Sequence, residues 1–102
     1  MSVPYVSTLT TALTTGDCDV RAVGAASAQA QAMTAGQTYR FVSSTNCWVK
    51  FGSNPTAVAG ADGNIYLPAN VELLVICQGT ATLCAVIRDT ADGNLSQTLV
   101  NP

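Results

Sequence analysis

Short runs of alternating apolar and polar residues, separated by turn residues, follow one another through the last two thirds of the chain. Such runs, bounded by Gly, Pro, Asn or Asp, are typical of β-strands. The expected strands are residues 37–42, 47–51, 65–67, 71–77, 83–88 and 95–100. Their spacing predicts an all-β domain, a sandwich or a barrel of antiparallel strands.

The expected strand at 47–51 has two different faces. Cys47, Val49 and Phe51 alternate with Trp48 and Lys50. Because successive side chains of a strand point to opposite faces of the sheet, the first three are expected in the core. Trp48 is then left on the second face, where it contacts a subunit, packs between sheets or stacks on a sugar.

Residues 22–35 allow two interpretations. Alanine is the best helix former, and Gly36 stands where a helix cap would be expected. Residues 28–33 nevertheless alternate strictly, which is the period of a strand. The alternation favours a strand over a helix here.

Two expected strands, at residues 73–77 and 83–87, are apolar on both faces. In a small antiparallel sheet one face normally meets water. A cover over the second face is therefore expected, and it could be another sheet, the N-terminal segment or a neighbouring subunit.

The beginning of the chain has a different composition. Residues 7–16 are rich in Thr and Ala and hold few large apolar side chains. We expect residues 1–27 to form an extended arm and residues 28–102 to form the β-sandwich. The first residues also lack the positive and apolar regions of a signal peptide, so assembly in a cytosol is expected.

Scarcity of charge limits the possible functions. Only 10% of the 102 residues are charged, and the net charge is −2, whereas globular domains usually carry about 25% charged residues. The apolar runs are shorter than the roughly 20 residues of a membrane-spanning helix. The four cations are widely separated, which disfavours direct binding of nucleic acid. A subunit that hides surface against other proteins fits this composition best.

The residues for catalysis are missing from the sequence. A Ser, Cys or Thr nucleophile normally needs a general base, most often His, and the chain has no His. Asp62 and Asp92 each precede Gly and are explained by turns. We therefore expect no enzyme activity and no cofactor.

The four cysteines are interpreted as small buried apolar residues. They lack the CxxC spacing of structural zinc sites, so no metal site is expected. A disulfide between Cys77 and Cys84 across a hairpin remains open.

Three stretches together resemble small structural proteins that tailed phages encode near the major capsid protein. They are CWVKFGSNPTA at 47–57, IYLPA at 65–69 and AVIRDTADGNLS at 85–96. The resemblance implies a head decoration, or cement, protein with a jelly-roll-like sandwich, whereas the N-terminal third departs from it. It further implies a homo-oligomer, with a trimer favoured over a dimer. Such a protein would bind the major capsid protein on the outside of the virion, after assembly in the host cytoplasm.

The expected interface residues are the large side chains of the arm and two aromatic residues of the sandwich. They are Tyr5, Leu9, Leu13, Trp48 and Tyr66. Two alternative functions remain: another virion subunit, in the tail or at the head–tail joint, and a surface carbohydrate-binding module that uses Trp48 or Tyr66.

Overall fold

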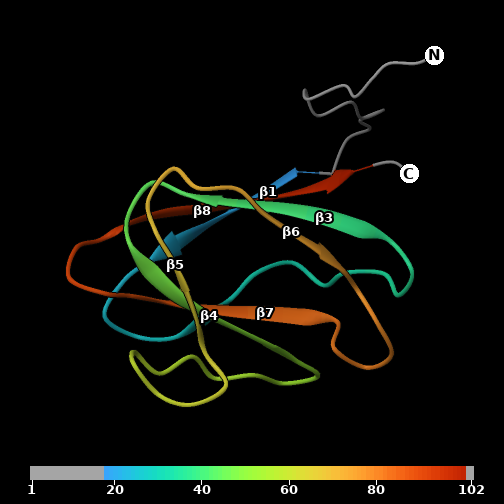
Figure 1. The fold of residues 1–102 in the computed structure, drawn as a ribbon, viewed down its shortest axis with the longest axis horizontal. Coiled ribbons are helices and arrows are strands. Elements are labelled where there is room, and N and C mark those ends of the chain that lie inside the picture. The colour runs from blue at the N-terminus through green and yellow to red at the C-terminus, as the bar shows by residue number, and fades with distance from the viewer. Residues whose placement is uncertain (1–17, 101–102) are drawn as a thin grey trace.

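The computed structural model describes residues 18–100, which form eight β-strands and no helix (Figure 1). The strands are β1 (Cys18–Val23), β2 (Ala28–Gln29), β3 (Thr38–Ser43), β4 (Cys47–Gly52), β5 (Ile65–Leu67), β6 (Leu73–Ile76), β7 (Leu83–Arg88) and β8 (Gly93–Val100). They form two four-stranded sheets. Sheet A has the order β1-β8-β3-β6, and sheet B has the order β2-β7-β4-β5. All observed pairings are antiparallel, so the predicted all-β antiparallel class is confirmed.

The two sheets enclose one apolar core. Phe41 of β3 and Val49 of β4 are fully buried there, and Leu95 of β8 and Val86 of β7 close it from the neighbouring strands. The ring of Phe51 meets that of Phe41 edge to face at a centroid distance of 5.5 Å. The predicted inner face of residues 47–51 is confirmed, since all three of its side chains belong to this core or pack against it.

The Ala-rich segment forms a strand and no helix, as the alternation favours. Only Ala28 and Gln29 pair with β7, however. Beyond them the backbone keeps contact through single hydrogen bonds, from Ala30 N to the carbonyl of Cys84 and from Met33 N to that of Thr82. Ala30 and Met33 are both buried although they are three residues apart, so the strict period of two ends there.

The boundary between the arm and the sandwich needs correction. An arm over residues 1–27 is predicted from the composition, but β1 pairs with β8 over six residues, from Cys18↔Thr98 to Val23↔Gly93. The alternation in β1 is hard to recognise because its inward positions carry Asp19 and Arg21 before the buried Val23. Residues 18–23 therefore belong to the sandwich and not to an arm.

Within residues 18–100, no helix is long and apolar enough to cross a membrane.

Candidate interaction surfaces

The outer face of sheet A is broad and nearly uncharged. Register and alternation place twelve strand residues on it: Cys18, Val20, Ala22, Thr38, Arg40, Val42, Leu74, Ile76, Asn94, Ser96, Thr98 and Val100. Arg40 is the one charged residue among these twelve, and Glu72 neutralises it through an ion pair. The large apolar side chains at its margins are well exposed: Val20 is 62%, Leu74 is 52% and Ile76 is 61% accessible.

The two edges of sheet A are built differently. On β1 the inward positions carry Asp19 and Arg21, and inward-pointing charges are a known way of discouraging further strand pairing at an edge. On β6 the inward positions are Leu73 and Val75, which pack against the core. The outward Leu74 and Ile76 leave the β6 edge apolar on both faces.

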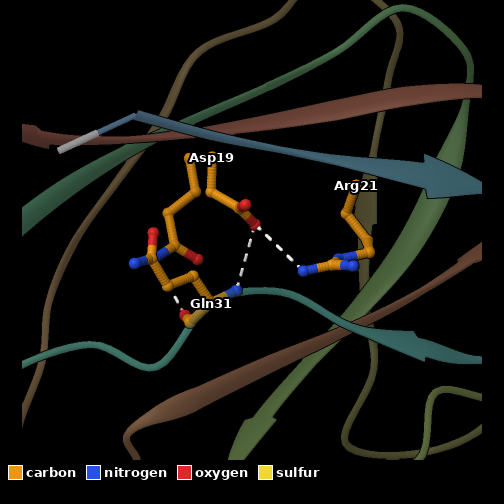
Figure 2. Close-up of polar contacts among 4 residues, drawn as sticks. Asp19, Arg21 and Gln31 are labelled. Carbon is orange, nitrogen blue, oxygen red and sulfur yellow. Dashed lines mark hydrogen bonds and ion pairs between the residues drawn. The ribbon is translucent and has the colours of Figure 1, made fainter. Parts of the chain in front are cut away.

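Figure 2 shows how the inward charges of β1 are accommodated. Asp19 and Arg21 point from β1 toward the segment at Gln31. The Asp19 carboxylate accepts a hydrogen bond from the Gln31 backbone N–H at 3.2 Å and lies 3.4 Å from the Arg21 guanidinium. Gln97 donates from Nε2 to the Gln31 carbonyl at 2.9 Å. This polar cluster joins β1 and β8 to the segment after β2.

The polar cluster is incompletely paired in the described structure. Gln97 is only 3% exposed, and its Oε1 has no hydrogen-bond partner, nor does the buried Nε of Arg21. Buried polar atoms without partners cost stability. The β1 side of the sandwich is therefore held less by apolar packing than the β6 side, where Tyr39 and Phe41 lie beside Val75 and Leu73.

Part of the outer face of sheet B is covered by the loop of residues 53–64, which follows β4 and folds back beneath the sheet to meet β2 and the residue before it (Figure 1). The side chain of Gln29 donates to Asn54 Oδ1 at 2.9 Å and to the Pro55 carbonyl at 3.0 Å, and Ala57 N donates to Ser27 Oγ at 2.8 Å. Ala85, on the outer side of β7, is completely buried.

The second face of 83–87 is buried at Ala85, beside this loop, and the loop is none of the three covers expected from the sequence. The second face of 73–77 has no comparable loop over it within residues 18–100. Figure 1 shows none, and Leu74 and Ile76 are exposed by more than half.

Trp48 and Tyr66, the two predicted interface residues of the sandwich, lie together on the outer side of sheet B. They are cross-strand partners, with ring centroids 5.0 Å apart and ring planes tilted by 56°. Trp48 is half-buried and donates from Nε1 to Asp89 Oδ1 at 3.1 Å, whereas Tyr66 is 42% exposed. Because the two rings are not coplanar, they do not form a flat stacking platform.

A shallow hollow of about 390 Å³ lies beside this loop, lined by Lys50, Phe51, Gly52, Ser53, Asn54, Pro55 and Thr56. It is open, and its lining comes from one continuous turn of chain. Within residues 18–100, no cluster of three His, Cys, Asp or Glu residues could hold a metal ion.

All four cysteines are free thiols, so Cys77 and Cys84 form no disulfide in this structure. Cys47, Cys77 and Cys84 are buried, as their interpretation as apolar residues predicts, but Cys18 is exposed. Burial raises the pKa of Cys47, and burial, with a smaller contribution from Cys47, raises the pKa of Cys84 to about 12. These two thiols are therefore held protonated, which opposes nucleophilic or metal-binding chemistry.

The other predicted interface residues, Tyr5, Leu9 and Leu13, lie outside the described residues. The predicted interface set omitted Val20, Leu74 and Ile76, the exposed apolar residues of sheet A. The two-sided apolarity of 73–77 was the signal for Leu74 and Ile76, but β1 offered none, because Val20 stands between two charged residues.

Comparisons with protein-family models, with curated proteins and with solved structures found no match. The arrangement itself is suited to contact with other macromolecules. It offers a flat sheet face with small and β-branched side chains, one neutralised charge and an apolar edge.

Proposed function

We propose that the protein is a structural subunit that binds other protein surfaces through the outer face of sheet A. The single observation that carries this proposal is the set of exposed apolar residues on that face, Val20, Leu74 and Ile76. The core of a protein interface is depleted of charged residues, and this face presents one neutralised cation. Its Thr, Ser and Val side chains also lose little conformational entropy on contact.

The partner follows from the resemblance of residues 47–57, 65–69 and 85–96 to phage head proteins. On that basis the protein is a decoration, or cement, protein that binds the major capsid protein from outside and stabilises the shell. It does so as a homo-oligomer, a trimer in this proposal. Binding that is specific to the assembled shell stabilises it by mass action.

A jelly-roll topology is part of the same proposal. The proposal is supported by eight strands in two four-stranded sheets, in which every connection except that between β4 and β5 passes from one sheet to the other. Jelly rolls occur in viral capsid proteins and in lectins. Since one fold serves many functions, the topology supports a capsid role only together with the outer face of sheet A.

The test is to isolate virus particles from the native source of the chain and to measure how many copies sediment with each particle. We expect a fixed, high copy number and density on the outside of the shell in particle images. Density only in the tail or at the head–tail joint would contradict decoration and support the other virion role. Absence of the chain from particles would overturn both.

A further inference from the structure

We propose that the edge of β6 receives the N-terminal segment of a neighbouring copy of this chain, residues 1–17, as an added β-strand. This inference rests on the proposed function as a homo-oligomeric structural subunit and names the contact between copies. In such strand addition, backbone hydrogen bonds supply affinity and alternate side chains supply specificity.

The first argument is the difference between the two edges of sheet A. An edge strand offers unpaired backbone N–H and C=O groups, and proteins commonly protect such edges with charges. The β1 edge carries Asp19 and Arg21 on its inner side. The β6 strand has only apolar residues, Leu73 to Ile76, on both faces. It is therefore the edge of sheet A that is prepared for another strand.

The second argument is the chemistry of the segment. From Ser2 to Gly16 it has no charged side chain, and Thr is its commonest residue, which favours strands. Its large residues Tyr5, Leu9 and Leu13 all stand at odd positions, so an extended segment presents them on one face. If the segment pairs with β6, Tyr5, Leu9 and Leu13 can lie on the same face of the sheet as the exposed Leu74 and Ile76.

The third argument is where the segment joins the fold. It enters sheet A at Cys18, in the transverse row Cys18–Thr98–Arg40–Leu74, on the edge opposite β6. Three strand spacings, about 14 Å, separate the two edges, and 17 extended residues span about 56 Å. A chain's own segment would have to cross the outer face before it could run along β6. A segment that comes from a neighbouring copy needs no such crossing.

The test uses the full chain with a photoreactive residue, Ile76→benzoylphenylalanine. Unlabelled and nitrogen-15-labelled copies are mixed, reassembled and irradiated. After trypsin, the N-terminal segment is recovered in one peptide, residues 1–21, because Arg21 is the first cleavage site. We expect cross-links from position 76 to this peptide, in pairs of mixed isotopic composition.

Val58 provides a matched control, since it is an apolar residue of similar exposure on the loop under sheet B, 51% against 61% for Ile76. Val58→benzoylphenylalanine should give no such cross-links. Cross-links between peptides of one isotope only would show that the chain's own segment covers β6 and would overturn the proposal. Cross-links from position 76 only to other peptides, or equal yields from positions 58 and 76, would also overturn it.

A second measurement tests the same contact without a cross-linker. Deletion of residues 2–15 should lower the molecular mass of the purified protein in solution from that of an oligomer to that of a monomer. The circular dichroism spectrum of the variant should remain that of a β-sheet protein. An unchanged oligomer would contradict the inference. Failure here is separable from failure of the proposed function, because sedimentation with virus particles reports on the capsid role whether or not copies exchange segments.

Discussion

The outer faces of the two sheets differ in what covers them, although both sheets have four strands and share one core. Under sheet B, residues 53–64 fold back against Gln29, the cross-strand partner of Ala85, and Ala85 is completely buried. On sheet A, Leu74 and Ile76 stay more than half exposed among residues 18–100. The first face is covered in part by its own chain, whereas no segment among residues 18–100 covers Leu74 and Ile76 on the second. A strand with apolar residues on both faces can therefore have its second face covered by a loop of the same chain, or can use that face as an interface.

A charge placed on each face should give the largest difference. Ala85→Glu puts a carboxylate under the loop and should lower the free energy of unfolding by about 3 kcal/mol or more, because a buried unpaired charge is costly. Ala22→Glu puts the same group on the outer face of sheet A, where the effect should stay within about 0.5 kcal/mol. Urea unfolding of both variants measures this. Equal losses would mean that the two faces do not differ in cover.

The stability of the protein at alkaline pH reports on Cys84, a thiol buried in the core. The pKa of Cys84 is raised from 9.0 to about 12, so the folded chain retains a proton that the unfolded chain releases above pH 9. The contribution of Cys84 is fully present below pH 9 and is lost as the pH rises toward 12, at up to about 1.4 kcal/mol per pH unit.

Unfolding free energies from pH 8 to 11, compared between the wild type and Cys84→Ala, isolate this thiol. The variant should show the shallower decline. The same slope in both proteins would argue against a protonated, buried Cys84.

The two edges of sheet A can be compared through their carboxylates. Asp19→Ala removes the acceptor of the Gln31 N–H and the partner of Arg21, so it should cost about 1–2 kcal/mol. Glu72→Ala breaks only the exposed ion pair with Arg40, which should cost less than about 1 kcal/mol. Thermal unfolding ranks the two variants. A larger loss of stability from Glu72→Ala than from Asp19→Ala would contradict the conclusion that polar contacts hold the β1 edge more than the β6 edge.

A small effect on stability is also expected at β6 itself. Leu74→Ser removes a side chain that is 52% exposed, so the unfolding free energy of the isolated subunit should change by less than about 1 kcal/mol. A larger loss in a variant shown to be monomeric by sedimentation would place Leu74 in the core and remove it from the interface.

Most of the fold follows from the alternation of the sequence, because a half-buried strand must alternate. The runs at 47–51, 65–67 and 83–88 appear in the structure within one residue of their predicted bounds. β1 escaped prediction because Asp19 and Arg21 occupy its inner positions, where periodicity requires apolar residues. Sheet order could not be predicted either, since it depends on contacts between distant strands such as β3 and β8.

The surface was predictable only in part. Trp48 lies on the face opposite Val49, as the alternation predicts, whereas the cover expected over 73–77 is not present among residues 18–100. The position of the loop 53–64 against sheet B depends on hydrogen bonds that the Gln29 side chain donates and the Ser27 side chain accepts. Such polar contacts leave no periodic signal in the sequence.

The central claim is that the outer face of sheet A binds another protein, and a matched pair of charged variants tests it most directly. Ile76→Lys and Val58→Lys introduce the same cation at exposed apolar positions, one on that face and one on the loop under sheet B. The measurement is the number of copies of each variant that sediment with virus particles. We predict a loss of about tenfold or more for Ile76→Lys, as for a residue central to an interface, and wild-type binding for Val58→Lys. Equal binding of the two variants would contradict the account.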